Sequence, residues 1–293
     1  MNGLVSAFME IIGQQPIWSF YRDGDKAELV DGSNNRIREG PGHTVTNYFD
    51  LATKIAELQF RNWGHVLLFR GQPRDHKDDR GRTKLRPNIF RADHPPGEQM
   101  LTERFDRLAR AGQMLVECYV LNSALNDQVE NDRLKRQRIL RWSILQHYKI
   151  CDTPLLDVTQ SIRIAASFAS HKASSEGFVF VLGVPNLSGA VTVSAEAGIQ
   201  IIRLASVCPP SAVRPHLQEG YLLGEYPEIE NYRQKALYDL KKIDVGRRLI
   251  AKFRFNPATF WEPVKFPLVM EEDLYPSPDP LLSVADQVKM LLQ

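Results

Sequence analysis

The sequence has few cysteines, and those it has lie far apart. Cys118, Cys151 and Cys208 are the three among 293 residues, and no two of them form a C-x-x-C pair. An odd, scattered set of cysteines is not typical of a disulfide-bonded secreted protein and favours a reducing compartment. We therefore expect a cytoplasmic protein.

Other absences narrow the range of functions. No apolar run approaches the roughly 18 residues of a membrane span, and the N-terminus lacks the basic start and continuous apolar core of a signal peptide. The His residues show no H-x-x-x-H or related ligand spacing, so no metal site is expected. A glycine-rich phosphate loop and an alternation of strands with helices are also missing, which argues against Rossmann and P-loop folds.

The chain has little net charge, because its 37 basic residues are nearly balanced by 35 acidic ones. The basic residues are skewed, with 24 Arg and 13 Lys, and they concentrate in residues 70–91 and 133–141. Most of these side chains are expected on solvated surfaces. Arg70 differs because it directly follows four apolar residues, which predicts a position at the end of a buried strand. A guanidinium there requires a carboxylate, several carbonyls or an anionic ligand.

The hydrophobic pattern predicts helices first and strands later. Leu51, Ile55 and Leu58 have helical spacing, and Asn47 can cap their helix. Such segregation of helices and strands is typical of one α+β domain, here residues 45–293, preceded by an appendage at residues 1–44. Residues 208–226 are predicted to be irregular. The expected helices span 46–60, 98–121, 131–148, 161–173 and 280–292, and the expected strands span 65–69, 177–182, 190–194, 199–204 and 249–255.

Polar residues become dense between positions 146 and 161. Gln146 and His147 end a predicted helix, and Asp157, Thr159 and Ser161 precede the next one. Taken alone, Asp157, Thr159 and Ser161 are ordinary capping residues, and a single histidine is more often a satisfied, partly buried side chain than a catalytic one. Spacing alone therefore does not identify a site here.

Taken together and in order, these segments resemble the FRG domain family, which is named for a Phe-Arg-Gly motif. The resemblance covers roughly residues 45–289, and its specificity comes from the ordered series rather than from any one motif. The matching residues are Phe69-Arg70-Gly71-Gln72, Leu85-Arg86-Pro87-Asn88-Ile89-Phe90-Arg91, Leu145-Gln146-His147-Tyr148, Thr153-Pro154-Leu155-Leu156-Asp157-Val158-Thr159, Ala165-Ala166-Ser167-Phe168-Ala169, Arg214-Pro215 with Gln218-Glu219-Gly220-Tyr221-Leu222, and Leu274-Tyr275-Pro276 with Asp279.

The layout of this family is similar to that of ADP-ribosyltransferase folds, so the resemblance implies N-terminal helices packed on a mostly antiparallel, split sheet. It further implies an NAD-dependent transferase that needs no metal and that serves as a toxin or anti-phage defence effector, with a protein or nucleic acid as acceptor. Arg70, His147, Gln218 and Glu219 would be catalytic. The residues implied to bind NAD are Arg70, Gly71, Gln72, Arg91, Asp157, Thr159 and Ser161.

Two other functions remain open at this point. A non-catalytic module could use the basic residues at 70–91 and 133–141 to contact RNA or DNA phosphates, although aromatic residues are sparse there, with Phe90 inside the first segment and Trp142 directly after the second. A structural or interaction protein with a vestigial pocket is the third alternative. Convergence of the implied site residues in one cleft would favour the enzyme.

Overall fold

A computed structural model of the chain describes residues 16–22, 24–30, 33–92, 96–122, 125 and 128–293. The chain divides into two compact units, each assembled from three segments. Unit 1 comprises the described residues of Met1–Leu85, Val158–Leu187 and Asp244–Glu271, and unit 2 comprises those of Arg86–Asp157, Ser188–Ile243 and Glu272–Gln293. Helices and mostly antiparallel strands occur in both, which confirms the predicted α+β class. The appendage at residues 1–44 stays a prediction, as does the ADP-ribosyltransferase-like layout.

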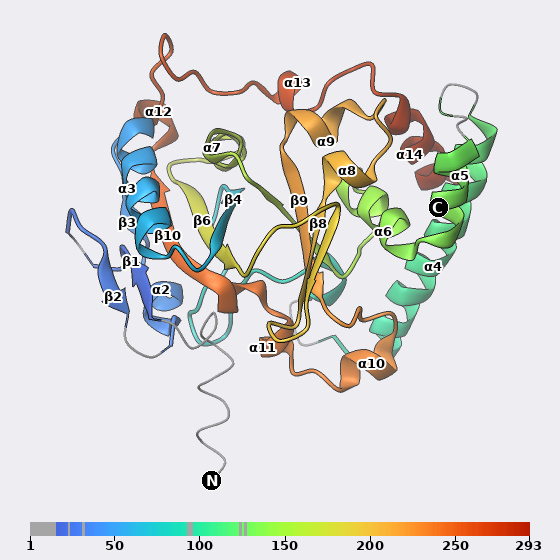
Figure 1. Cartoon of the computed structure of the whole chain (residues 1–293), viewed down its shortest axis with the longest axis horizontal. Coiled ribbons are helices and arrows are strands. Elements are labelled where there is room, and N and C mark those ends of the chain that lie inside the picture. Colours follow the sequence, from blue (N-terminus) through green and yellow to red (C-terminus); the bar gives the residue numbers. More distant parts are fainter. Residues whose placement is uncertain (1–15, 23, 31–32, 93–95, 123–124, 126–127) are drawn as a thin grey trace. The chain divides into compact units, whose positions relative to one another are not determined.

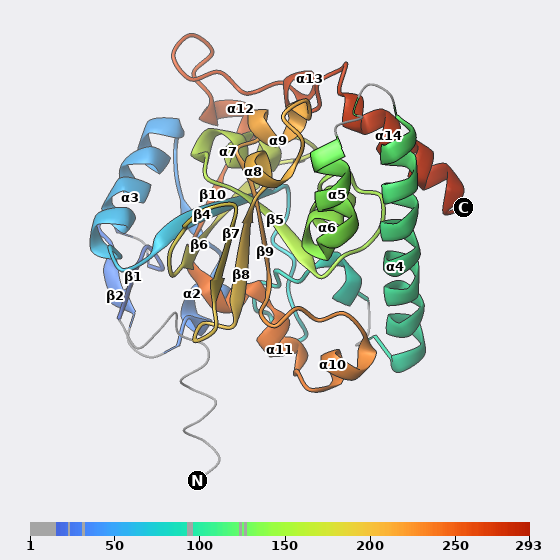
Figure 2. The same ribbon diagram turned by 45° about the vertical axis from the view of Figure 1, so that its right-hand side comes forward.

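Unit 1 contains a sheet with the strand order β3-β10-β6-β4-β5, of which Figure 1 labels the first four strands and Figure 2 labels β5. Three of its pairings are antiparallel, and the pairing of β3 with β10 is parallel. The end of β5 joins this sheet where Thr159 pairs with Phe69. The strands that lie wholly in unit 1 are β3 (His43–Thr44), β10 (Leu249–Phe255), β6 (Gly177–Val184) and β4 (Val66–Gln72), whereas β5 (Leu155–Thr159) begins in unit 2 and ends in unit 1. Unit 1 also contains β1 (Ile17–Ser19), β2 (Glu28–Val30), α2 (Asn35–Glu39), α3 (Tyr48–Arg61), α7 (Ile162–Ser170), η2 (Val245–Arg248) and α12 (Pro257–Phe260).

Helix α7 packs on strands β4 and β6 at two glycines. A Cβ atom added at Gly71 would lie 1.7 Å from the carbonyl oxygen of Ala165, and one added at Gly177 would lie 2.9 Å from the carbonyl oxygen of Ala169. Contacts this short are impossible for real Cβ atoms, so any other residue would push the helix away from the sheet. The glycine of the Phe-Arg-Gly motif therefore permits backbone-to-backbone packing.

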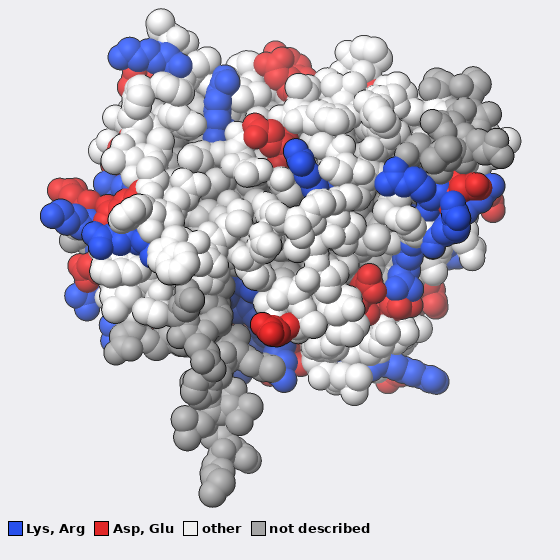
Figure 3. Space-filling model, in the orientation of Figure 1, with Lys and Arg blue, Asp and Glu red and all other residues white. Residues whose placement is uncertain are grey.

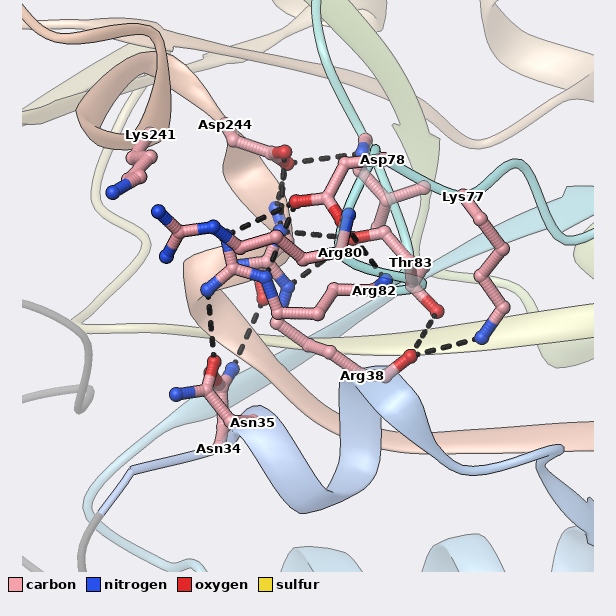
Figure 4. A network of polar contacts seen from close by, with 12 residues as sticks. Asn34, Asn35, Arg38, Lys77, Asp78, Arg80, Arg82, Thr83, Lys241 and Asp244 are labelled. Atoms are coloured by element: carbon pink, nitrogen blue, oxygen red, sulfur yellow. Dashed lines mark hydrogen bonds and ion pairs between the residues drawn. The ribbon is translucent and has the colours of Figure 1, made fainter.

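A buried polar network joins α2 to the segment that follows β4 and to the segment that precedes β10 (Figure 4). The Arg38 guanidinium lies 3.1 Å from the Asp244 carboxylate and donates two hydrogen bonds to the carbonyl of Thr83. The second oxygen of Asp244 accepts from the backbone amides of Leu85 and Gly246. Both charged side chains are at most 3% exposed, so each depends on the other for charge compensation.

Unit 2 is built around one long helix, α4 (Glu98–Leu121), which packs against α5 (Gln128–Arg136), α6 (Arg138–His147) and α14 (Pro280–Leu291) (Figure 2). Leu101, Phe105, Leu108 and Leu115 recur at helical spacing on α4, and all four are buried in one hydrophobic core. The remaining elements of the unit are η1 (Asn88–Phe90), the antiparallel strands β7 (Val191–Ser194), β8 (Ile199–Arg203) and β9 (Gly220–Glu225), and the short helices α8 (Leu204–Val207), α9 (Val213–Leu217), α10 (Tyr232–Ala236) and α11 (Leu240–Ile243). Helix α13 (Glu271–Leu274) begins at the last residue of unit 1.

Three sequence predictions are wrong. The helix expected at 131–148 is two helices, because Gln137 adopts an extended conformation and the Arg141 guanidinium donates to the carbonyls of Leu134 and Lys135 at the break. The stretch at 208–226, expected to be irregular, contains α9 and the buried strand β9. Strand β4 continues to Gln72, so Arg70 lies inside the strand and is half-buried rather than at the end of a strand.

Candidate functional site

The first group of functional side chains lies where α6 ends and β5 begins, within unit 2. The Nδ1 atom of His147 lies 3.4 Å from the Asp157 carboxylate, so the carboxylate selects the ring tautomer with its proton on Nδ1. The His147 side chain is 3% exposed, whereas that of Asp157 is 39% exposed. The Nε2 atom of His147 is buried and has no hydrogen-bond partner among the described residues. An available lone pair on an oriented imidazole is the arrangement of a general base.

A chain of hydrogen bonds holds the Asp157 carboxylate in place behind the histidine. The Gln146 amide nitrogen donates to Asp157 over 2.6 Å, and its amide oxygen accepts from the Thr153 hydroxyl. The Thr153 oxygen in turn accepts from the backbone amide of Leu155 at the start of β5. Gln146 and Thr153 were not predicted as site residues. Both could have been found from the sequence, because Gln146 lies in the same motif as His147 and Thr153 in the same motif as Asp157.

The residue after His147 ties this region to the C-terminal helix. The Tyr148 hydroxyl donates to the Asp279 carboxylate over 2.8 Å, and the other oxygen of Asp279 caps α14 by accepting from Leu281. Burial and the neighbouring carboxylate raise the pKa of Tyr148, so its hydroxyl remains a neutral donor. Tyr148 and Asp279 therefore have a structural role beside the candidate base.

The predicted residues Gln218 and Glu219 separate into two different environments. The Gln218 side chain is buried, and its amide nitrogen donates to the carbonyl of Leu274 over 2.7 Å. Glu219 is exposed and has a φ of +44°, a left-handed conformation that is strained for this residue type. It is followed by Gly220, where an added Cβ would lie 3.6 Å from Cε1 of His147. The segment is therefore adjacent to the candidate base.

The predicted residues of the Phe-Arg-Gly motif lie on β4 in unit 1. Gly71 faces α7, as its contact with Ala165 requires, so the alternation of a strand places Arg70 and Gln72 on the opposite face. The Arg70 side chain is half-buried, with a fully buried Nε. Gln72 is 7% exposed, and its Oε1 atom has no hydrogen-bond partner among the described residues.

The other residues predicted to bind NAD have local structural contacts. The Thr159 hydroxyl accepts from the backbone amide of Ser161, and the Ser161 hydroxyl caps α7 by accepting from Ile164. Arg91, in unit 2, donates from Nε to the carbonyl of Arg86 over 2.7 Å. The structure therefore brings His147 and Asp157 into contact in unit 2 and places Thr159 next to the Phe-Arg-Gly motif in unit 1.

The basic segments have many internal partners in the described part of the chain. Arg82 pairs with Asp78 and is 5% exposed, contrary to the general expectation of a solvated loop. Arg138 lies 2.5 Å from Glu230, and Arg141 donates to two backbone carbonyls. On the face shown in Figure 3, basic and acidic side chains lie side by side along α4 and α5.

A groove of about 510 Å³ lies between α4 and α6 in unit 2. Phe105 and Val116 contribute apolar surface, and Arg138, Arg141 and Glu230 contribute charge. None of the predicted site residues lines it, so we do not assign the candidate chemistry to this groove.

The described residues include three cysteines and side chains of the types that ligate metals. Burial raises the pKa of the Cys151 thiol to about 12 and also raises that of Cys118, which keeps both protonated. Within the described ranges, no cluster of three or more His, Cys, Asp or Glu side chains is placed to hold a metal ion.

None of the helices described is both long and apolar enough to cross a membrane.

Comparison with known proteins identifies one segment of the chain. No curated protein and no solved structure matches the chain. The FRG domain family matches residues 65–177, which include β4, the His147–Asp157 pair, α7 and both glycines on which α7 packs. The motifs at 214–222 and 274–279, which also resemble motifs of this family, lie outside the match. Residues 65–177 are therefore an FRG domain.

Proposed function

We propose that the protein is an NAD-dependent ADP-ribosyltransferase-like enzyme in which His147 is the general base. The observation that carries the proposal is the buried His147 ring, with Asp157 at Nδ1 and an Nε2 that has no partner among the described residues. A carboxylate at Nδ1 orients the ring and stabilises the imidazolium that forms when Nε2 takes a proton. This arrangement is suited to activating a hydroxyl or amine nucleophile.

The proposed reaction transfers ADP-ribose without oxidation or reduction. The N-glycosidic bond of NAD breaks, and nicotinamide leaves with the bonding electrons through an oxocarbenium-like transition state. An oxygen or nitrogen of a protein or nucleic-acid acceptor forms the new bond to the ribose carbon, and its proton passes to Nε2 of His147. Because Nε2 is shielded from water, the side chains that cover it must move when substrates bind.

Glu219 is the better of the two candidates for stabilising the ribosyl cation. Its carboxylate carries the required negative charge, and its side chain is exposed. Gln218 is neutral and buried, and its amide nitrogen already donates to the carbonyl of Leu274. We therefore assign Gln218 to holding the segment in place and Glu219 to the reaction.

The experiment measures nicotinamide release by the purified full-length chain with NAD and protein, RNA, DNA or small-molecule acceptors. His147→Asn keeps a donor for Asp157 but removes the base, and we expect a fall in kcat of at least about 100-fold with little change in KM. His216→Asn, an exposed histidine in the same unit, is the matched control and should behave as wild type. The proposal fails if wild type releases no nicotinamide, or if His147→Asn retains full turnover.

The proposal includes a cytoplasmic setting and a role as a toxin or anti-phage effector. Cys118, Cys151 and Cys208 form no disulfide bond with one another, which is consistent with a reducing compartment. Uncontrolled ADP-ribosylation in the cytoplasm should slow growth. Expression of the wild-type chain, but not of His147→Asn, is therefore expected to arrest a bacterial host, and equal growth of the two strains would contradict the role as a toxin.

A further inference from the structure

Arg214, on α9 in unit 2, is a buried cation with an incomplete set of partners. Its guanidinium lies between two aromatic rings, with Cζ 4.8 Å from the ring centres of both Tyr148 and Tyr275. Its Nη1 donates to the carbonyl of His147 over 3.4 Å, and its Nε is buried without a hydrogen-bond partner among the described residues. Arg214 is only 8% exposed.

Among the described contacts, no carboxylate pairs with the Arg214 guanidinium. The nearby Asp279 carboxylate accepts from the backbone amide of Arg214, the Tyr148 hydroxyl and the start of α14, and it forms no ion pair with the guanidinium among the described contacts. Contacts between a cation and a ring are weak individually, whereas removing a guanidinium from water without pairing it with a carboxylate is costly. Two rings and one long hydrogen bond therefore leave Arg214 in need of an anion.

A second cation contacts the same tyrosine. The Lys149 Nζ atom lies 5.2 Å from the ring centre of Tyr275 and donates to its hydroxyl over 3.3 Å. Lys149 is exposed and has no carboxylate partner among the described residues. Its φ of +52° is a left-handed conformation, which is strained for a residue with a side chain. The chain therefore holds two cations at Tyr275, immediately beside the candidate base.

We propose that Arg214 and Lys149 form a phosphate-binding site that receives the pyrophosphate of a dinucleotide. The two positive charges match the two negative charges of a pyrophosphate, and a guanidinium is well suited to phosphate oxygens. The contact between Arg214 and the His147 carbonyl places this site beside the base. The identification of the ligand as NAD rests on the proposed function, whereas the affinity for a pyrophosphate group does not.

The test is a calorimetric titration of the full-length chain with ADP-ribose, which carries the pyrophosphate but has no nicotinamide to release. A lost charge-assisted hydrogen bond lowers affinity by about 10- to 100-fold, and this is the effect expected for Arg214→Gln. Arg203→Gln, an exposed arginine on β8 of the same unit, should not change the affinity. Inorganic pyrophosphate should bind wild type and lose affinity in Arg214→Gln, whereas adenosine should show no such dependence.

Lys149→Gly provides a second variant in case Arg214→Gln fails to fold. Glycine relieves the left-handed strain, so we expect a higher midpoint of unfolding together with an affinity for ADP-ribose that is reduced by about threefold to tenfold. A residue with a purely structural role would not move stability and binding in opposite directions.

The site and the proposed function can fail separately. Equal ADP-ribose affinity in wild type, Arg214→Gln and Lys149→Gly overturns the site, as does a wild-type chain that binds neither ADP-ribose nor pyrophosphate. Binding that depends on Arg214, without any nicotinamide release, supports the site and contradicts the transferase. Nicotinamide release with an unchanged KM for NAD in both variants supports the transferase and contradicts the phosphate-binding site.

Discussion

The buried ion pair between Asp244 and Arg38 provides a direct test of what holds unit 1 together. We predict that Asp244→Asn lowers the free energy of unfolding by about 3–5 kcal/mol. Asparagine keeps an oxygen that can accept from the amides of Leu85 and Gly246, but it removes the negative charge that lies 3.1 Å from Arg38. Because the two side chains are 3% and 1% exposed, water cannot replace the lost carboxylate.

The chain offers a matched control at nearly the same distance. Glu28 and Arg22 are 3.0 Å apart, but their side chains are 44% and 60% exposed. Water and salt screen this pair, so Glu28→Gln should change the free energy of unfolding by less than about 1 kcal/mol. The difference between the two substitutions therefore measures the effect of burial rather than that of distance.

The assay is urea unfolding at pH 7, followed by far-ultraviolet circular dichroism. The double variant Arg38→Met with Asp244→Asn removes the uncompensated cation and should regain part of the stability lost in Asp244→Asn. Equal losses in Asp244→Asn and Glu28→Gln, or a double variant less stable than Asp244→Asn, would refute the reasoning.

Two other predictions concern the FRG domain itself. Gly71→Ala should lower the free energy of unfolding by about 3 kcal/mol or more, because the new Cβ would overlap the Ala165 carbonyl. Gly24→Ala is the control, because a Cβ at this position meets no described atom within 4 Å. Equal melting temperatures of the Gly71→Ala and Gly24→Ala variants would contradict the prediction. For Asp78, burial alone raises the carboxyl pKa, but hydrogen bonds from the Arg82 amide and guanidinium help to lower it below the ordinary value. A lowered pKa stabilises the fold above about pH 4, and this contribution is lost as the pH falls through the folded-state pKa. The difference in unfolding free energy between wild type and Asp78→Asn should therefore shrink from pH 7 to pH 3. A difference that stays constant over this range would disprove the prediction.

Elements with a long or strongly periodic pattern were predictable from the sequence. Helix α4 has the predicted bounds because its apolar residues recur over many turns, and Asn47 caps α3 as predicted by accepting from Asp50. Strand β10 likewise matches its prediction at residues 249–255. Strand β9 was not predictable, because a short apolar run fits a strand or a helix equally well until a partner such as β8 is known.

The candidate site was only partly predictable. The motifs pointed to His147 and Asp157, but capping and chemistry look alike in a sequence, and Ser161 proves to be a helix cap. The role of Gln146 in holding Asp157 depends on the meeting of a helix end and a strand start, which no spacing rule specifies.

By itself, the sequence determined the α+β class, the long helix of unit 2 and membership of residues 65–177 in the FRG domain family, because these depend on local periodicity and on an ordered series of motifs. The tertiary structure alone decided which polar residues are chemically available. It showed that the motif glycine Gly71 is required for packing against α7, that Nε2 of His147 has no described partner, and that Arg214 is buried with no ion pair among the described contacts. Burial and pairing arise from contacts between segments far apart in the chain, and these properties separate a structural charge from a functional one.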